Sequence, residues 1–504
     1  MTHTQADENS GALRGGFLRM KARQDNTEKD DVFTFAGGLL MNTLWTRRAL
    51  LQGMGAATSA IAFSSCSQQL SRNPVGLPAA ALAVQPIIDP ASLEKPNLTV
   101  GYVPVNDCAP FAVAWEKGFF RKYGLNVTLS REASWGNSRD GIIFGRLDAS
   151  PVVSGAVTNA RTGAEGARHF PLCAAMTIHR HGNALTMNRQ LWEGGVRPWH
   201  SYGGDLDAFG RDLRNFWDKS PIDERVWAVV LSSSIYEYFV RYLVAAVGID
   251  PLKQLRLIIT PPPQMVSNTR IGAMQAYMVA EPWNTRAISG NEGIGFTFIQ
   301  GREIWQGHPD RVLAVRESFI EDYPKTYRSL VKAIIEACQY CGNPANREEV
   351  ATIISQRSFT GANIKYTRPG IVGNFNYGGF DNQPRITNSA ETTLFFDLPS
   401  ATIPHDHSTF LWQSQSLWLM TQAARWGQIA EFPKNADEIA RQAWRTDLYR
   451  EIAAEMGIQC PAEDYKIEPS TAFIDGKSFD PSDPVGYLNS FEIRANAPQS
   501  FFFA

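Results

Sequence analysis

The stretch GYVPVNDCAPFAVAWEKGFFRKYGLNV, residues 101–127, decides the expected fold. It begins inside a short run with β-branched residues, 98–103, which is typical of a buried strand. Pro110 then opens an apolar segment with helical spacing that Gly118 ends, and residues 126–130 suit a second strand. With a further helix expected over 137–145, this order predicts a parallel sheet covered by helices.

A second unit of the same kind is expected further along the chain. Strands are predicted over 226–231 and 255–260, and helices over 234–247 and 264–276. Two such units predict a two-lobed body with a cleft between the lobes, where small ligands usually bind.

The last third of the chain is expected to be mostly helical. Apolar residues recur at helical spacing over 324–341, and two more helices are predicted within 408–457. The tail from residue 468 onward is expected to be extended and polar and to wrap the surface.

Composition excludes one class of partner. The 504 residues include 48 Lys and Arg against 50 Asp and Glu, and 44% of them are hydrophobic. Such a chain can bury a large core, but it has no basic excess to attract nucleic acid. No nucleic-acid partner is therefore expected.

The N-terminal part has the order of an export signal. Arg47 and Arg48 precede an apolar stretch, 49–63, that is too short for a convincing bilayer span, and Phe63-Ser64-Ser65-Cys66 resembles a bacterial lipobox. The arginine pair also resembles a twin-arginine signal, so Sec and twin-arginine export both stay open, as do Met1 and Met41 as starts. We expect a lead and signal over 1–66, lipid on Cys66, and a tether over 67–96.

Six motifs then carry a resemblance. Besides the opening stretch, ASWGNSRD, RYLVAAVGIDP, PPPQM, EPWN and HPDR occur in the order and spacing of the nitrate- and bicarbonate-binding proteins of bacterial ABC transporters. The segment FIDGKSFDPSDPVGYLNSFEIRA resembles the end of that family, so the similarity covers about 97–495.

The resemblance implies an α/β fold with two lobes, a type II-like periplasmic binding protein with a helical C-terminal extension. On this reading the substrate-binding domain is 97–504, with lobe 1 at about 97–185 plus part of the C-terminal third and lobe 2 at about 222–315. Such a protein is no enzyme: it stands in the periplasm, anchored to the cytoplasmic membrane by lipid, and closes on a small inorganic anion for an ABC permease and its ATPase subunits. The substrate favoured is nitrate, with nitrite as a further candidate.

Four residues match the family's ligand-binding positions: Trp135, Asn183, Tyr236 and Arg311. Asn183 stands where nitrate-type members have Gln, Tyr236 where they have His, and Arg311 where they have Lys. The planar guanidinium of Arg311 suits a planar oxyanion, which favours nitrate. The alternatives are a core Trp135, a Tyr236 that only packs on its helix, and an Arg311 on a surface loop, since HPD is typical of a turn.

The motif ASWGNSRDG, residues 133–141, is expected to place an anion at the start of a helix. Gly136 would let the backbone approach the ligand, and Asn137 or Ser138 would cap the helix. Trp135 would then act from one lobe, with Arg311 and Tyr236 closing from the other.

Pro262, Gln264, Val279 and Ala280 are expected at strand ends that shape the floor of the cleft, or else as a strand breaker and core residues. Glu281 suits a capping or hinge role, and no residue near it completes a metal site. Neither a metal nor a cofactor is expected.

Three alternatives stay open. Bicarbonate-type members use an acidic residue and a calcium ion at the position of Arg311. The pyrimidine-precursor synthases of thiamine metabolism and cytoplasmic sensors of nitrate resemble the same fold, but neither needs an export signal. No phosphate-binding loop with the full pattern Gly-x-x-x-x-Gly-Lys-Ser/Thr and no Gly-x-Ser-x-Gly motif is present.

Two further patterns are weak evidence for a metal or redox site. Cys338 and Cys341 lie inside a predicted helix with no second pair, so ordinary core or surface cysteines are expected. His179 with His181, and His405 with His407, are expected in loops as exposed or capping residues.

Overall fold

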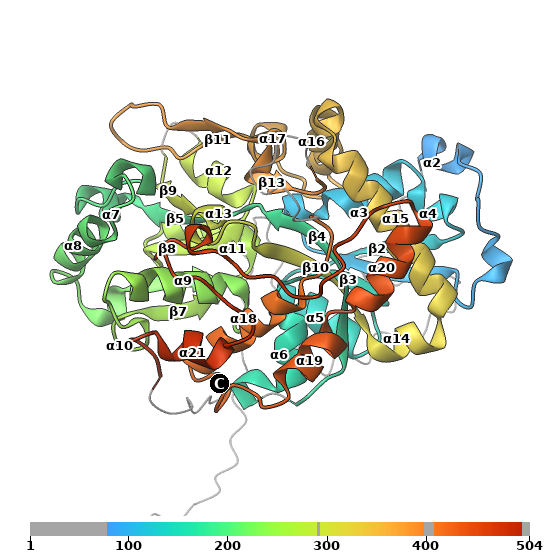
Figure 1. The fold of residues 1–504 in the computed structure, drawn as a ribbon. Helices are drawn as coiled ribbons and strands as arrows, with labels where there is room; N and C mark the ends of the chain where they lie inside the picture. The colour runs from blue at the N-terminus through green and yellow to red at the C-terminus, as the bar shows by residue number, and fades with distance from the viewer. Residues whose placement is uncertain (1–77, 167, 290–292, 398–407, 496–504) are drawn as a thin grey trace, which may run out of the picture. The chain divides into compact units, whose positions relative to one another are not determined.

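Two mixed β-sheets organise the chain in the computed structural model, which describes residues 78–166, 168–289, 293–397 and 408–495 (Figure 1). All of these belong to the unit Asn73–Ala504. The other unit, Met1–Arg72, lies outside the described residues, and with it the predicted export signal and Cys66. Among the described residues no helix is long and apolar enough to cross a membrane.

The first sheet has six strands in the order β13-β4-β10-β3-β1-β2. Its strands are β1 (Asn97–Tyr102), β2 (Asn126–Arg131), β3 (Ala149–Val153), β4 (Leu172–His181), β10 (Pro309–Arg316) and β13 (Thr393–Leu394). β1 is parallel to β2 and β3, whereas β10 is antiparallel to β3 and β4. The parallel arrangement predicted from residues 101–127 is confirmed for these first strands and not for the whole sheet.

The second sheet has five strands in the order β7-β6-β8-β5-β9. They are β5 (Asn183–Asn188), β6 (Val226–Val229), β7 (Arg256–Ile259), β8 (Ala276–Ala280) and β9 (Gly295–Gln300). β6 is parallel to β7 and β8, and β5 is antiparallel to β8 and β9. The sheet lies to the left of the first one in Figure 1.

The chain crosses between the sheets twice, which explains the antiparallel strands. β4 leads into β5 through Gly182 alone, whose φ of 88° is a conformation that glycine adopts without strain. The chain returns from β9 to β10 through residues 301–308. The backbone N–H of Gly307 donates to Nε2 of His181 at 2.9 Å, so the two crossings are tied together. β10, with Arg311, consequently lies in the first sheet and not beside the strands of 222–280.

Helices surround both sheets. On the first sheet they are α3 (Ala109–Glu116), α4 (Phe119–Lys122), α5 (Trp135–Ile143), α6 (Ala156–Thr162), α14 (Glu317–Asp322) and α15 (Pro324–Gly342), with the short turn η2 (Asn106–Cys108) after β1. Near the second sheet lie α7 (Arg189–Glu193), α8 (Leu206–Trp217), α9 (Ile235–Ala246), α10 (Pro251–Gln254), α11 (Pro262–Arg270), α12 (Trp283–Ile288) and α13 (Gly301–Ile304). Further elements are α2 (Ala79–Ala83), α16 (Arg347–Ser355), α17 (Ile364–Val372) and the hairpin β11 (Asn374–Asn376) with β12 (Ile386–Asn388).

Several boundaries differ from the sequence prediction. Ser134, and not the expected Asn137 or Ser138, caps α5 by accepting from the N–H of Asn137, so the helix begins at Trp135 and not at residue 137. The helix expected to run to residue 276 ends at Arg270, because β8 starts at Ala276. The helix predicted from Pro324 is confirmed as α15, and Cys338 and Cys341 are buried in it.

The C-terminal part holds more structure than the sequence suggested. Three helices, α18 (Gln413–Arg425), α19 (Ala436–Ala443) and α20 (Thr446–Glu455), stand where two were expected, and α21 (Pro484–Asn489) lies in the tail. The tail is not merely polar: Phe473 stacks on Trp305 and Trp418, and Phe479 and Phe491 are buried with it in the core. Burial of these rings anchors the segment.

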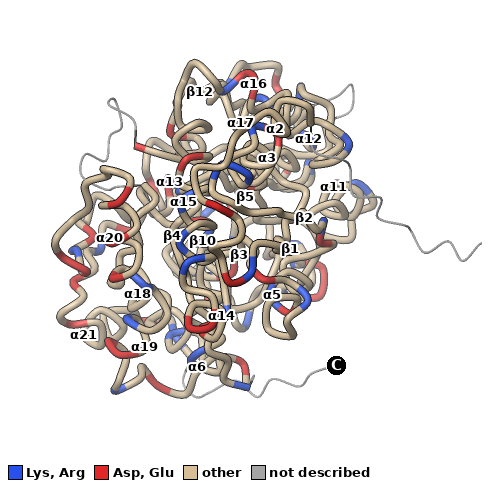
Figure 2. Tube along the Cα trace, turned by 90° about the vertical axis from the view of Figure 1, so that its right-hand side faces the viewer, with Lys and Arg blue, Asp and Glu red and all other residues tan. Residues whose placement is uncertain are grey.

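Charge is spread along the chain. Basic and acidic residues are interspersed in Figure 2, and no large region of one sign stands out in that view. This agrees with the near balance of charge in the sequence.

Candidate functional site

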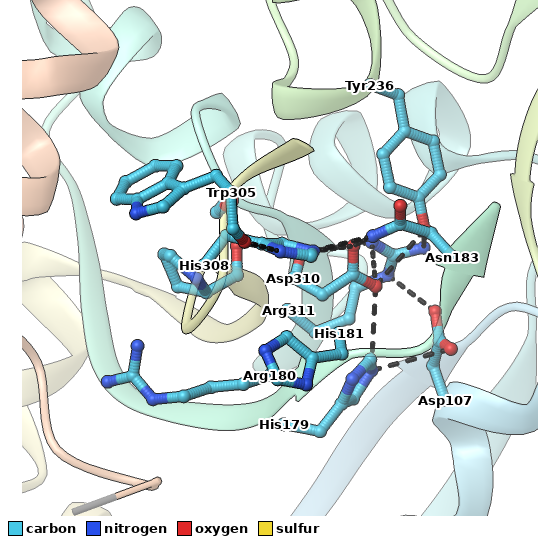
Figure 3. A network of polar contacts seen from close by, with 12 residues as sticks. Asp107, His179, Arg180, His181, Asn183, Tyr236, Trp305, His308, Asp310 and Arg311 are labelled. Atoms are coloured by element: carbon cyan, nitrogen blue, oxygen red, sulfur yellow. Dashed lines mark hydrogen bonds and ion pairs between the residues drawn. The ribbon is translucent and has the colours of Figure 1, made fainter. Parts of the chain in front are cut away.

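A buried polar network lies where the chain crosses between the sheets (Figure 3). Its members come from five elements and are between 0 and 3% exposed: Asp107 on η2, His179 on β4, Asn183 on β5, Tyr236 on α9, and Asp310 and Arg311 on β10. Asp107 and Tyr236 follow the carboxyl ends of β1 and β6, the edge at which α/β sheets hold ligands. The network therefore joins both sheets at one point.

Arg311 is the centre of this network. Its Nε lies 2.7 Å from Oδ2 of Asp107, and one terminal nitrogen lies 2.9 Å from Oδ2 of Asp310. The other terminal nitrogen donates to the hydroxyl of Tyr236 at 2.7 Å. Arg311 is 0% exposed, so the alternative of a surface loop is excluded.

Two aromatic rings lie close to the guanidinium. Its central carbon lies 4.2 Å from the centre of the Trp135 ring and 4.9 Å from that of Tyr236. Such contacts favour a cation and keep water away from it. Nε1 of Trp135 is buried without a hydrogen-bond partner among the described residues, so this donor is available to a ligand.

Asn183 lies at the first position of β5, directly after the first crossing. Its Nδ2 lies 2.5 Å from Oδ1 of Asp310 and 2.8 Å from Nε2 of His308. A Cβ on Gly301 would come within 2.0 Å of Oδ1 of Asn183, so the amide fits only against a glycine. The amide donors expected to face the anion are thus partly engaged by Asp310.

The histidines differ from the sequence prediction. His179 and His181 are buried on β4, and neither lies in an exposed loop. Nε2 of His179 lies 3.4 Å from Oδ1 of Asp107 and 3.9 Å from Oδ2 of Asp310. The prediction failed because 172–181 forms a long central strand whose side chains are buried on both faces. His405 and His407 lie outside the described residues.

Burial and nearby charges shift the pKa values of the two carboxyl groups in different directions. Burial acts to raise the pKa of Asp107, but Arg311 and His179 outweigh it and hold the pKa below its ordinary value. Burial raises the pKa of Asp310 to about 6 despite the same guanidinium. Arg311 keeps its proton, because the two carboxylates more than offset the burial that would lower its pKa.

Glu281 lies next to this network at the end of β8. Its carbonyl accepts from the N–H of Asn106 at 2.7 Å, and its own N–H donates to the carbonyl of Gly182 at 3.2 Å. Burial raises the pKa of its carboxyl to about 7. Because these bonds connect the loop after β1 to the first crossing, the position suits the hinge role considered for it.

The remaining predicted site residues lie outside the network of Figure 3. Val279 and Ala280 are buried on β8 and pair with Ala184 and Asn183 of β5. Pro262 is buried at the start of α11, whereas Gln264 on the same helix is exposed. Ala280 is thus a neighbour of Asn183 in the sheet, and the expected strand-end positions of Pro262 and Gln264 are helical.

Two members of the site, Asp107 and Asp310, were not singled out from the sequence, and a third, His179, was named but expected in a loop. Asp107 lies in VNDCAP, directly after the first strand, and Asp310 precedes Arg311 in HPDR. A carboxylate just after a parallel strand was the available signal for Asp107. The sequence offered none for its pairing with Arg311.

Residues 91–355 match the model of the NMT1-like family. The chain belongs to this family. The match includes all the residues of the network, from Asp107 to Arg311.

Curated relatives cover most of the chain. It is 35% identical over 403 residues to the nitrate import ATP-binding protein NrtC of Synechocystis, a match that covers 80% of this chain and 56% of that protein. The chain therefore spans little more than half the length of this relative. It is also 27% identical over 468 residues to the bicarbonate-binding protein CmpA of Synechococcus elongatus, covering 89% of this chain and 98% of that one.

A solved structure supports the fold. The crystal structure of the periplasmic nitrate-binding protein NrtA from Synechocystis superposes with a TM-score of 0.69 at 24% identity, covering 81% of this chain and 100% of that one. The expected periplasmic binding protein fold is thereby confirmed.

Proposed function

We propose that the chain is the extracytoplasmic substrate-binding component of an ABC importer for nitrate, with nitrite as a further candidate. The observation that carries the proposal is the buried guanidinium of Arg311, which contacts the rings of Trp135 and Tyr236 at the crossing of the two sheets. A planar fork with an unpartnered indole N–H beside it suits a small planar oxyanion.

The family and its relatives support the transport class. NrtC is named for nitrate import and CmpA for binding bicarbonate, and both match this chain over most of its length. We propose that the chain binds its anion without converting it, and that its partners are a permease and ATPase subunits. A synthase or a cytoplasmic sensor on this fold is the competing class.

Ligand-driven closure is the proposed working motion. A ligand held by Trp135 on α5 and Tyr236 on α9 contacts both halves of the molecule, and it stabilises the state in which they meet. The proposed halves are those of the sequence prediction, about 97–185 with part of the C-terminal third and about 222–315. The crossings at Gly182 and at 301–308 suggest moving both limits to these segments.

The proposed location is the periplasmic side of the cytoplasmic membrane, with a lipid on Cys66. The support is the signal-like order from Arg47 to Cys66. Metabolic labelling with a palmitate analogue tests it. The label is expected on the wild type and not on Cys66→Ala, and label retained by that variant would contradict the anchor.

Bicarbonate is the second candidate substrate, and one observation favours it. Asp107 and Asp310 already offset the charge of Arg311, so the site offers a bare anion less attraction than an unpaired arginine would. A cation that accompanies bicarbonate would restore that attraction, as the calcium of the bicarbonate-type members is expected to do.

Calorimetry on the full chain separates these candidates. Nitrate, nitrite and bicarbonate are each titrated with and without calcium. The proposal expects nitrate to bind equally well with and without calcium, because Arg311 and not calcium contacts the anion. Tight bicarbonate binding that needs calcium would replace nitrate by the second candidate, and binding of none of the three would contradict the transport proposal.

A further inference from the structure

Asp107, His179 and Asp310 each direct one potential ligand atom to a shared buried point (Figure 3). Oδ1 of Asp107, Nε2 of His179 and a carboxylate oxygen of Asp310 all lie within 4.8 Å of one another. The two distances from Nε2 of His179 are 3.4 Å to Asp107 and 3.9 Å to Asp310. Ligand atoms around a metal at about 2.1 Å stand roughly 3 to 4.2 Å apart, so a small contraction suffices.

His179 is the independent sign that a group belongs there. The side chain is 0% exposed, and neither ring nitrogen has a hydrogen-bond partner among the described residues. Leaving a buried polar group unpaired costs about 1–3 kcal/mol. Nε2 faces carboxylate oxygens at 3.4 Å and 3.9 Å, too long for a strong hydrogen bond, and this arrangement suits a metal ligand.

Arg311 contacts both carboxylates without blocking the oxygen of Asp107 that faces His179. Its Nε pairs with Oδ2 of Asp107, so Oδ1 of that carboxylate remains on the side of His179. Oδ2 of Asp310 has a guanidinium nitrogen at 2.9 Å and accepts from the hydroxyl of Tyr236 at 3.1 Å, so one of these contacts must lengthen when Asp310 binds the ion. One guanidinium against two carboxylates also leaves an excess of negative charge, which attracts a cation.

We infer that Asp107, His179 and Asp310 form a binding site for a divalent transition-metal ion. One imidazole and two carboxylates suit ions such as Mn²⁺, Fe²⁺ or Zn²⁺. Calcium prefers six to eight oxygen ligands, and an imidazole in the set counts against it. The inference therefore differs from calcium-assisted bicarbonate binding in both the ion and the residues that hold it.

The ion changes what the site attracts. Without it, Arg311 is outweighed by Asp107 and Asp310; with it, the sum becomes positive and favours an oxyanion next to Arg311. This second step rests on the proposed function, whereas the metal site does not. Because coupling is reciprocal, oxyanion and metal should each increase the affinity of the other.

Metal binding is tested first, with no anion ligand present. The full chain is treated with a chelator, dialysed, and titrated with Mn²⁺ by electron paramagnetic resonance and with Zn²⁺ by calorimetry. We expect a single bound ion per chain, with the affinity reduced at least about tenfold in His179→Gln and in Asp310→Asn. Asp148→Asn is the matched control, since Asp148 is also buried and ion-paired, with Lys95, and its metal affinity should equal that of the wild type.

Pulsed resonance on the wild type keeps the test independent of variants that fail to fold. Mn²⁺ bound through His179 should show coupling to an imidazole ¹⁴N nucleus. Absence of stoichiometric binding, absence of nitrogen coupling, or binding of calcium and magnesium alone would each overturn the metal site. Equal affinity in the folded variants and the wild type would do the same.

Titration with anions separates the metal site from the proposed function. Nitrate and bicarbonate are titrated into the metal-free and the Mn²⁺-loaded full chain, and the ion should increase the affinity of one of them at least about tenfold. Equal anion affinity with and without Mn²⁺ would overturn the coupling and leave the proposed function standing. Stoichiometric metal binding with no anion bound in either state would overturn the proposed function and leave the metal site standing.

Discussion

The guanidinium Nε of Arg311 lies 2.7 Å from Oδ2 of Asp107, although one residue is on β10 and the other on the turn after β1. Both side chains are buried, so the pair holds the antiparallel strand β10 to the loop that follows the first strand of the sheet. The pair also means that the one charge expected to attract an anion is already compensated in this structure. Stability and binding therefore depend on the same contact.

The first prediction concerns stability. Arg311→Met leaves Asp107 and Asp310 without their partner, and the free energy of unfolding should fall by about 3–5 kcal/mol. Urea denaturation followed by circular dichroism measures it. Arg441→Met is the control, because Arg441 is 64% exposed and its partner Glu438 is 43% exposed, and its loss should not exceed about 1 kcal/mol. Similar losses in both variants would contradict the role given to burial.

Trp135 allows binding to be separated from packing. The ring is only 1% exposed, so Trp135→Ala would open a cavity and cost folding as well as binding. Trp135→Phe keeps an aromatic ring against Arg311, removes the indole N–H and leaves a smaller cavity than alanine. We expect nitrate affinity to fall by about 1–3 kcal/mol, the cost of an unmade hydrogen bond, with a smaller fall of thermal midpoint than in Trp135→Ala. An unchanged affinity would show that Nε1 does not contact the anion and that Trp135 is a core residue.

The raised pKa of Glu281 predicts that the stability of the folded chain depends on pH. Burial raises the pKa of its carboxyl to about 7 in the folded chain from an ordinary 4.5. Between pH 4.5 and pH 7 the carboxyl of Glu281 is ionised in the unfolded chain but still protonated in the folded chain. The free energy that Glu281 contributes to folding is therefore fully present below pH 4.5 and is lost by about pH 7. The loss amounts to roughly 3 kcal/mol.

Denaturation of the wild type and Glu281→Gln at a series of pH values checks this. The wild type should lose stability relative to the variant between pH 4.5 and pH 7, because glutamine does not ionise. Parallel curves for the two proteins would show that the carboxyl is not shifted. The comparison removes the contributions of groups that both proteins share.

Two glycines test how closely the backbone approaches the site. A Cβ on Gly301 meets Oδ1 of Asn183 at 2.0 Å, so Gly301→Ala should displace the amide from Asp310, cost about 1–3 kcal/mol in stability, and weaken oxyanion binding. A Cβ on Gly136 would meet no atom closer than Oγ of Ser134, at 3.7 Å. Gly136→Ala should therefore stabilise α5 by roughly 0.5–1 kcal/mol.

Binding to the Gly136→Ala protein decides a separate point. The sequence suggests that the backbone at Gly136 passes close to the ligand. Calorimetry with nitrate should then show weaker binding in a protein that is at least as stable as the wild type. Unchanged affinity would show that the ligand lies nearer to Arg311 than to the start of α5.

Local sequence patterns predicted the strands and helices better than the contacts between residues far apart in the chain. The strands near 98–103 and 226–231 and the helix from Pro324 are confirmed, since spacing and breakers act within a few residues. Tyr236 and Arg311 were predicted to act from the same lobe, but Arg311 lies on β10 of the first sheet, and its guanidinium donates to the hydroxyl of Tyr236 across the two sheets at 2.7 Å. Asp107 was missed as the partner of Arg311, because that contact depends on β10 returning to the first sheet. Burial of His179 depends on the same long-range arrangement, through the central place of β4 between β10 and β13.

The central claim is that a small planar oxyanion binds beside Arg311 within the closed site. A crystal structure of the full chain grown with nitrate, and a second grown with bicarbonate, tests it most directly. The account predicts triangular density within hydrogen-bond distance of Nε1 of Trp135 and in contact with the guanidinium of Arg311 or the hydroxyl of Tyr236. A well-ordered oxyanion bound only elsewhere, or a site in which Trp135, Tyr236 and Arg311 close on each other with neither anion present, would contradict it.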